Sequence, residues 1–360
     1  MIALCFFAQM VYAQKTPHFI SVRWSDLPDW MQDDFNDVGL ALSQSCEVLA
    51  QDDLWKNFCA RAEKYQRQPE RLRELIMSEL QPYKVVNDNK SNRGLITGYY
   101  EPLLKGSFFP NKDYPYPVYA RPDDLMEASS PMVVDGYDVP ISRVKIENDQ
   151  IVPYDTRAEL MQEGRLAGNE LLWVSDPIEL FFLQVQGSGR IEIEDGRIIR
   201  VGYADHNGYP YRSIGRVLIE RGELASYEAS MQRIRQWAKD NPAKVNELLA
   251  KNPRYIFFRI QDGSQDAGPV GSLGVPLTPE RSVAVDRRYI PLGAPVYIST
   301  TMPNSSQPLN RLMFAQDTGN AIVGPVRADY FWGYGDRAER LAGGMKQSVR
   351  LWVLLPRKSN

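Results

Sequence analysis

One stretch near the C-terminus, residues 314–335, sets two carboxylic acids among short apolar runs, tight turns and aromatic side chains. The apolar runs of residues 312–315 and 321–323 are broken by two glycines and a proline. This pattern is typical of short strands joined by tight turns. We therefore expect a β-rich segment in which Asp317 ends one strand and Asp329 follows the next.

The residues after Asp329 are aromatic: Tyr330, Phe331 and Trp332. Burial beside aromatic rings disfavours the charged form of a carboxylic acid and raises its pKa. An acid that stays protonated near neutral pH can protonate a leaving group. Asp286 is a third acid that closes a short apolar run. The competing interpretation is that these aspartates only form turns, which aspartate favours.

The composition suits a globular protein large enough for two domains. The chain has 360 residues, 43% of them hydrophobic and 24% charged. Its 25 prolines and 25 glycines favour short strands and turns over long helices. A net charge of −3 gives no case for a nucleic-acid partner. No internal apolar run reaches the ~20 residues that a membrane span requires, and the few scattered His and Cys residues predict no metal site or organic cofactor.

The N-terminal apolar stretch predicts export. Residues 1–13 read as a secretory signal that is cleaved after Ala13, because the apolar run is too short to span a bilayer. Attachment of lipid at Cys5 is disfavoured, since Leu4 stands where a small residue is required. Cys46 and Cys59 flank a predicted turn and either pair in an oxidising periplasm or remain two buried thiols.

The chain changes character several times along its length. Residues 29–79 have helical apolar spacing, and residues 95–102 read as a strand whose adjacent Tyr99 and Tyr100 point to opposite faces. Short strands and turns follow over residues 106–211. They include a hairpin at residues 191–199 that turns at Asp195-Gly196.

The segment before that hairpin predicts a polar surface. Residues 182–186 read as a strand with Gln184 and Gln186 on one face, and the following Gly-Ser-Gly of residues 187–189 allows close approach of a ligand. A plain edge strand with a glycine bulge is the alternative. His206 is expected to be a surface hydrogen-bonding residue. The remaining predicted elements are helices over 211–221, 230–239 and from 241, and strands over 254–260, 282–285, 295–299, 312–315 and 351–354.

Three separated motifs resemble one enzyme family. They are TGYYEP at residues 97–102, QVQGSG at 184–189 and YRSIG at 211–215. Together they resemble the membrane-bound lytic murein transglycosylase A family. The C-terminal part resembles its "3D" module, whose three aspartates fall on Asp286, Asp317 and Asp329. The resemblance runs from about Leu95 to Pro356.

The resemblance implies a fold and a reaction. The fold is mainly β with flanking helices: a double-psi β-barrel main domain with a second, inserted β-barrel domain. The expected division is residues 14–105 for the N-terminal helical part, 106–211 for the insertion and 212–360 for helices plus barrel. The implied reaction is non-hydrolytic cleavage of the β-1,4 bond between N-acetylmuramic acid and N-acetylglucosamine, leaving 1,6-anhydromuramic ends. The implied partner is a peptidoglycan glycan strand, and the protein is expected to be a periplasmic monomer without cofactor. Association with the outer membrane stays open, because the lipobox that anchors the family is missing.

The same resemblance assigns roles to residues. Asp329 matches the single catalytic acid, Asp317 a nearby acid that supports it in the catalytic pair, and Asp286 the third, supporting acid. The predicted sugar contacts are Thr97, Tyr99, Tyr100, Gln186, Ser188 and Trp332. One acid suffices because the C6 hydroxyl of the substrate attacks the anomeric carbon in place of water.

Three other functions compete with this one. An inverting glycoside hydrolase would use Asp329 as acid and Asp317 as base. A non-catalytic cell-wall protein would bind the glycan and release nothing. An aspartic protease would need two Asp-Thr-Gly elements, and only the one at residues 317–319 is present.

Overall fold

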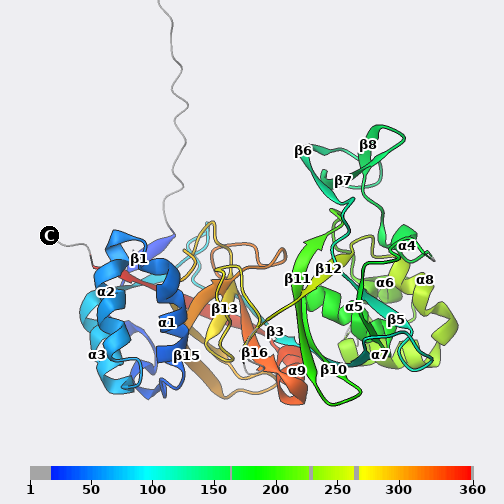
Figure 1. The fold of residues 1–360 in the computed structure, drawn as a ribbon. Helices are drawn as coiled ribbons and strands as arrows, with labels where there is room; N and C mark the ends of the chain where they lie inside the picture. The colour runs from blue at the N-terminus through cyan, green and yellow to red at the C-terminus, as the bar shows by residue number, and fades with distance from the viewer. Residues whose placement is uncertain (1–17, 163, 227–229, 263–266, 358–360) are drawn as a thin grey trace, which may run out of the picture.

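The computed structural model describes residues 18–162, 164–226, 230–262 and 267–357. The predicted signal of residues 1–13, with Cys5, lies outside the described residues. Within the described part of the chain, no helix is long and apolar enough to cross a membrane. The described residues fold into two β units side by side (Figure 1).

The first unit is a closed barrel. Its eight-stranded sheet has the order β1-β2-β17-β14-β15-β13-β16-β3, and a further pairing of β17 with β3 closes six of these strands into a ring. The strands are β1 (Phe19–Ser21), β2 (Leu80–Val85), β3 (Gly94–Glu101), β13 (Ser282–Val285), β14 (Pro295–Thr301), β15 (Pro308–Asp317), β16 (Arg327–Tyr334) and β17 (Lys346–Pro356). The mainly-β prediction is therefore confirmed, whereas the double-psi connectivity stays a prediction.

Helices cover the barrel on two sides. The predicted helical region at residues 29–79 contains the 3-10 turn η2 (Trp30–Gln32), α1 (Val38–Leu49), α2 (Asp53–Lys64) and α3 (Pro69–Glu79), preceded by η1 (Trp24–Asp26). Cys46 and Cys59 form a disulfide between α1 and α2, with Cα atoms 5.5 Å apart, which decides between the two alternatives left open by the sequence. On the side facing the second unit, α9 (Gly335–Gly344) packs on β3 and β16.

The second unit is built on a six-stranded sheet of order β12-β11-β10-β4-β9-β5. A single bridge between Ala120 and Phe258 joins its two outer ends. The strands are β4 (Leu103–Ser107), β5 (Tyr116–Tyr119), β9 (Glu170–Val174), β10 (Ser188–Ile193), β11 (Ile198–His206) and β12 (Ile256–Ile260). The predicted hairpin is confirmed, because β10 and β11 pair antiparallel around Asp195-Gly196.

This unit extends well beyond the expected end of the insertion at residue 211. Its sheet begins at Leu103 and includes β12, which pairs with β11. The helices α6 (Ile214–Glu220), α7 (Met231–Asp240) and α8 (Val245–Ala250), with the short η4 (Pro242–Lys244), were expected to belong to the main domain. They bury their apolar faces in a cluster with Phe181 and Phe182 of the second unit instead. The structure therefore places the insertion at about residues 103–260.

The prediction of a strand at residues 182–186 was wrong. This segment is the second half of α5 (Pro177–Gln186). Asp176 caps the helix by accepting hydrogen bonds from the amides of Ile178 and Glu179, and the left-handed Gly187 ends it. Gln184 and Gln186 therefore do not share one strand face: Gln184 is buried and Gln186 is half-buried.

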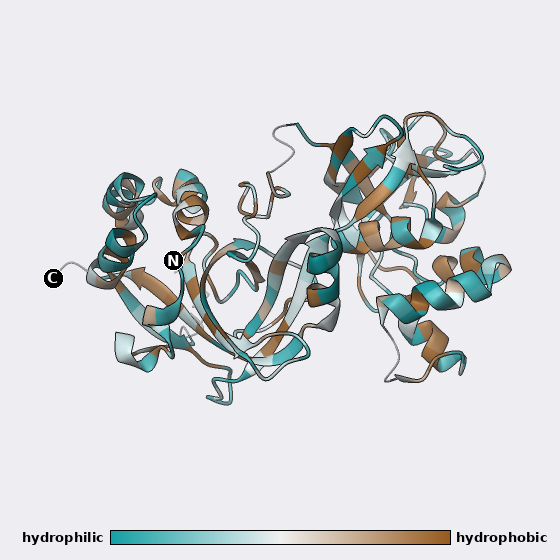
Figure 2. Cartoon of the chain, turned by 90° about the horizontal axis from the view of Figure 1, so that it is seen from below, coloured by the Kyte–Doolittle hydropathy of each residue, from teal (hydrophilic) through white to brown (hydrophobic). Residues whose placement is uncertain are grey.

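A small antiparallel sheet projects from the second unit (Figure 1). It contains β6 (Met126–Met132), β7 (Ile141–Glu147) and β8 (Gln150–Pro153), and the short α4 (Arg157–Leu160) follows it. Figure 2 shows hydrophobic and hydrophilic residues alternating along the barrel strands. That alternation fits strands with one face in the core and one face outward.

Candidate active site

Four residues on adjacent barrel strands form one row. Asp317 of β15 pairs with Ala284 of β13, Ala284 pairs with Asp329 of β16, and Asp329 pairs with Thr97 of β3. Directly paired residues project to the same face of a sheet. The two acids therefore share a face and are separated by a single strand, which contributes only the small side chain of Ala284.

Asp329 is the residue that the sequence resemblance assigns as the catalytic acid. It lies within β16 rather than after a strand, because residues 321–323 form no strand. The Thr97 hydroxyl donates a hydrogen bond to Asp329 Oδ1 at 2.6 Å. Burial raises the pKa of Asp329 to about 6, and nearby Asp317 adds to the rise, while Thr97 and Arg327 oppose it. Asp329 is thus mostly protonated below about pH 6, and near neutral pH it keeps a larger protonated fraction than an ordinary aspartic acid.

The aromatic residues after Asp329 differ in their orientation. Tyr330 and Trp332 stack on each other in the barrel core, with ring centroids 4.3 Å apart. Phe331 alternates with them along the strand. Its ring lies 5.2 Å from that of Tyr99. Of the three aromatic residues, Phe331 therefore shares the face of Asp329.

Asp317 ends β15, as the sequence predicts, and both its oxygens accept hydrogen bonds. Tyr99 Oη donates to Oδ2 at 3.0 Å, and the Ser272 amide and hydroxyl each donate to Oδ1 at 2.9 Å. Burial raises the pKa of Asp317, against the effect of these donors. Burial and the two neighbouring aspartates also raise the pKa of Tyr99, so its phenol remains a proton donor to Asp317.

Asp286 does not join this row. It forms an ion pair with Arg288 at 2.5 Å and accepts a hydrogen bond from the Gly324 amide at 2.8 Å. These partners hold the pKa of Asp286 at about 2, so it is a fixed anion. The predicted supporting role is therefore structural: Asp286 ties the end of β13 to the turn before β16.

The predicted sugar contacts fall into two groups. Thr97, Tyr99, Gln186 and Ser188 keep part of their surface exposed. Tyr100 and Trp332 are each only 2% exposed and belong to the barrel core. Trp332 Nε1 contacts the sulfur of Met345, and Tyr100 touches the second unit through its amide, 3.4 Å from Gln186 Oε1. Burial in the core therefore contradicts the predicted sugar contacts of Tyr100 and Trp332.

Two residues that sequence reasoning missed complete the site. Arg327 Nη2 donates to the Thr97 hydroxyl at 2.9 Å, and Ser272 binds Asp317 as described above. Arg327 lies two residues before Asp329 on one strand, a spacing that places both on one face and that the sequence displays. No comparable signal marks Ser272, which reaches Asp317 from 45 positions away.

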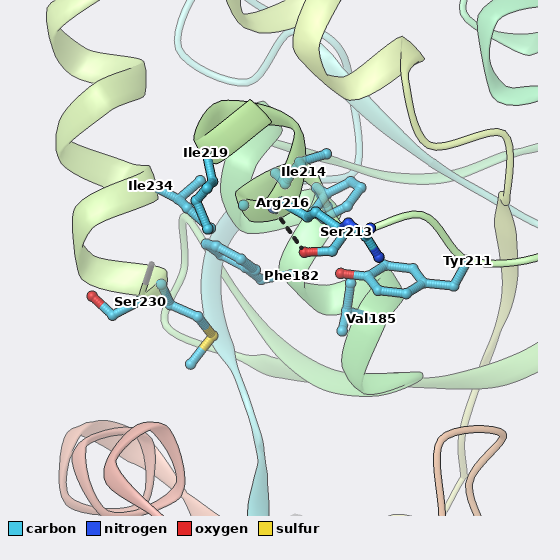
Figure 3. A pocket seen from close by; sticks show the side chains of 12 residues that line it. Phe182, Val185, Tyr211, Ser213, Ile214, Arg216, Ile219, Ser230 and Ile234 are labelled. Atoms are coloured by element: carbon cyan, nitrogen blue, oxygen red, sulfur yellow. Dashed lines mark hydrogen bonds between the residues drawn. The ribbon is translucent and has the colours of Figure 1, made fainter. Parts of the chain in front are cut away.

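Two further observations concern metal ligands and cavities. In the part of the chain that the structure describes, no cluster of three or more His, Cys, Asp or Glu residues is placed to bind a metal. A cavity of about 300 Å³ lies among α5, α6 and α7 of the second unit. Figure 3 shows Phe182, Ile219 and Ile234 on one side of it and Tyr211 on the other. None of the acids of the row lines this cavity.

Comparison with known proteins connects this geometry to a family. Residues 95–259 match the family model described as the MltA specific insert domain, and residues 281–355 match the 3D domain. The Escherichia coli (strain K12) protein named membrane-bound lytic murein transglycosylase A is 34% identical over 267 residues, which is 72% of this chain and 64% of that relative. The match thus spans slightly less than two thirds of the relative's length.

Solved structures give a longer match. The crystal structure of MltA from Neisseria gonorrhoeae is 37% identical and superposes with a TM-score of 0.85 over 95% of this chain and 93% of that one. A crystal structure of E. coli MltA with bound chitohexaose is 27% identical, with a TM-score of 0.72 over 95% of each chain. The likeness extends across both β units.

Proposed function

Because the chain belongs to the membrane-bound lytic murein transglycosylase A family, we propose that it cleaves peptidoglycan glycan strands without water. The bond broken joins N-acetylmuramic acid to N-acetylglucosamine through a β-1,4 linkage, and the product carries a 1,6-anhydromuramic end. The observation that best supports this proposal is Asp329, a partly buried acid whose pKa of about 6 keeps a transferable proton available.

A single acid can serve both halves of this reaction. Asp329 gives its proton to the glycosidic oxygen as the C1–O bond breaks, and the leaving sugar departs as an alcohol. The C6 hydroxyl then bonds to C1 and returns its proton to the Asp329 carboxylate. Atoms and protons balance without water, and Asp329 ends the cycle protonated. The negative charge of Asp317 assists by raising the pKa of Asp329.

The glycan strand is proposed to lie along the face that carries the two acids. Tyr99, Gln186 and Ser188 have polar groups that can hydrogen-bond sugar hydroxyl and acetamido groups. Each such contact contributes on the order of 1 kcal/mol. The chitohexaose bound in the E. coli relative, a chain of β-1,4-linked N-acetylglucosamine, supports this class of ligand. The names of the relatives support an extracytoplasmic, membrane-associated location.

An inverting hydrolase is the second candidate, and one observation favours it. Asp317 and Asp329 flank a single strand, which sets their backbones roughly 10 Å apart. Carboxyl groups roughly 6.5–9.5 Å apart are typical of inverting enzymes. However, both Asp317 oxygens already accept hydrogen bonds from Tyr99 and Ser272. A carboxylate so occupied is a poor base for water, which weighs against this candidate.

Digestion of purified sacculi tests the proposal. The expected products, identified by mass spectrometry, carry anhydro ends one water molecule lighter than reducing ends. Asp329→Asn removes the transferable proton and is expected to lower the rate by at least ~10²-fold while the fold is retained. Asp336→Asn, an exposed acid on α9 of the same unit, is the matched control and should keep the wild-type rate. Reducing ends labelled by ¹⁸O from water would establish the hydrolase instead.

A further inference from the structure

Arg327 is held against the catalytic acid through Thr97. Arg327 and Asp329 lie two residues apart on β16, and Thr97 is the cross-strand partner of Asp329 on β3. The Arg327 guanidinium donates to the Thr97 hydroxyl at 2.9 Å, to the Leu95 carbonyl at 3.4 Å and to the carbonyl of Ala328. Its position is thus fixed by contacts to both strands.

The chemistry of the donors fixes the direction of the first hydrogen bond and favours one direction for the second. A guanidinium has only donors, so the Thr97 oxygen must accept from Arg327. The single hydrogen of the Thr97 hydroxyl is then directed to Asp329 Oδ1, 2.6 Å away. Oδ1 is occupied as an acceptor, and the proton of the neutral acid is therefore placed on Oδ2. With one lone pair taken by Arg327, the threonine oxygen is a weaker acceptor for Asp329. Without Arg327 both lone pairs are free, which favours a turned hydroxyl that accepts the proton of Asp329 itself.

We propose that Arg327 is a positioning residue for the transglycosylase reaction, which orients Thr97 so that the transferable proton of Asp329 sits on Oδ2. This inference rests on the proposed function. Oδ2 is then the oxygen that gives a proton to the glycosidic bond and takes one back from the C6 hydroxyl. Arg327 does not touch the reacting atoms in this scheme; it acts through Thr97.

The charge of Arg327 has a second consequence. The charged or titratable groups facing Asp329 are Arg327 on the same strand, Asp317 on β15 and Tyr99 on β3, while β13 contributes the neutral Ala284. Arg327 is the cation in this set, and it opposes the effects of burial and of Asp317 on the pKa of Asp329. Removing it should raise that pKa and move the fall in activity to higher pH.

Arg327→Met is the test variant, because it keeps an unbranched apolar stem similar to that of arginine and removes the charge and the donors. The plateau kcat at low pH should fall on the order of tenfold, a fraction of what general acid catalysis contributes, with KM nearly unchanged. The descending limb of the pH–rate profile should move to higher pH. Arg327→Lys keeps the charge and a donor, and should restore the position of that limb and part of kcat.

Arg350→Met is the matched control. Arg350 of β17 donates to the hydroxyl of its own cross-strand partner Ser299 at 3.1 Å, another contact between an arginine and a hydroxyl on neighbouring barrel strands, without an acid attached to it. This control should leave both kcat and the pH profile at wild-type values. Thermal unfolding of each variant identifies any loss of kcat that comes from misfolding.

The outcomes separate this inference from the proposed function. An Arg327→Met enzyme with raised KM and an unmoved pH limb would mean that Arg327 binds substrate, and the inference would be wrong. If the wild type releases no anhydro ends, the proposed function fails. A titration of Asp329 by carboxyl ¹³C NMR, assigned with Asp329→Asn, still measures whether Arg327→Met raises its pKa. An unchanged pKa there overturns the inference without any activity measurement.

Discussion

Asp317 and Asp329 stand in the same row of the barrel, yet their partners give them different tasks. Asp317 accepts hydrogen bonds on both oxygens, from Tyr99 and Ser272. Asp329 accepts one, from Thr97, on Oδ1. The acid with an oxygen left for the substrate is therefore Asp329, and Asp317 acts on it through charge.

Replacing Asp317 by Asn tests this division of labour. The protonated form of Asp329 does the work, so the rate falls about tenfold per pH unit above its pKa of about 6. Removing the charge of Asp317 lowers that pKa, so the decline should begin at lower pH and kcat at pH 7 should fall on the order of tenfold. Measuring kcat on sacculi from pH 4.5 to 8 checks this. A decline displaced to higher pH would contradict the role given to Asp317.

For individual residues, the sequence predicts the two acids but not the side chains that contact them. The apolar run before Asp317 indicates a strand end, and the aromatic residues after Asp329 indicate burial. The contact of Asp329 with Thr97 depends on how β16 and β3 pair across 232 positions of sequence. Such a register is set by closure of the barrel, which local patterns do not encode.

The turn that leads into β16 is held by a single buried anion at the end of β13. Asp286 binds the Arg288 side chain and the Gly324 amide, and both contacts stabilise its ionised form. The pKa of about 2 lies below the value near 4 expected in an unfolded chain. Asp286 thus contributes stability that is complete above about pH 4 and is lost as the pH falls toward 2.

Asp286→Asn should therefore destabilise the barrel without touching the chemistry. The expected loss is on the order of 1–2 kcal/mol at pH 7, discounted because Arg288 is exposed to solvent. Urea unfolding at pH 7 and at pH 3 measures it, and the difference from wild type should shrink at the lower pH. Asp113→Asn, at an exposed bend, serves as control. A large fall in kcat with unchanged stability would instead give Asp286 a direct part in catalysis.

Helix α5 illustrates which elements sequence patterns resolve. Asp176 and Pro177 before the apolar run, and Gly187 after it, are ordinary signals for a helix start and end. The run of residues 182–186 is too short for its period to distinguish strand from helix. Without the capping residues on either side, the short apolar run favours a strand. The hairpin of β10 and β11 was predicted correctly because its turn residues and its alternation agree.

The chain passes from the first β unit to the second between β3 and β4, and a buried ion pair lies at this junction. Arg190 of β10 binds Glu101, the last residue of β3, at 3.0 Å, with side chains 2% and 0% exposed. Its guanidinium also lies 3.8 Å from the ring centre of Tyr334, at the end of β16. Ala267, on the returning connection, accepts a further hydrogen bond at 3.1 Å. Both crossings therefore converge on Arg190.

This convergence could not be inferred from the sequence. The composition changes near residue 106, which indicates an insertion, but helices after residue 211 resemble those of any domain. Their assignment depends on the apolar partners that they bury, and these lie on α5. The motif that contains Glu101 was read as the end of a strand. Glu101 anchors the two units through Arg190 of β10, a contact that depends on how β10 packs in the folded protein.

Breaking this pair should cost far more than breaking a surface pair. Arg190→Met leaves the Glu101 carboxylate in the interior without its ion-pair partner, and burial already raises the pKa of Glu101 despite that partner. The expected loss is about 3–5 kcal/mol. In the double variant Glu101→Met/Arg190→Met both partners of the pair are removed, and Arg200, which also interacts with Glu101, keeps its hydrogen bonds to Gly268 and Gln261. Part of the lost stability should therefore return. Urea unfolding measures all three proteins.

The matched comparison is Lys105→Met, which breaks the exposed pair of Lys105 and Glu192 in the same sheet and should cost under about 1 kcal/mol. If Arg190→Met costs no more than Lys105→Met, the pair does not anchor the junction.

The double variant Glu101→Met/Arg190→Met also reports on function. It retains every group that acts on the substrate, so kcat should persist in the folded protein. A raised KM would then measure how far the position of the second unit, with Gln186 and Ser188, depends on this junction.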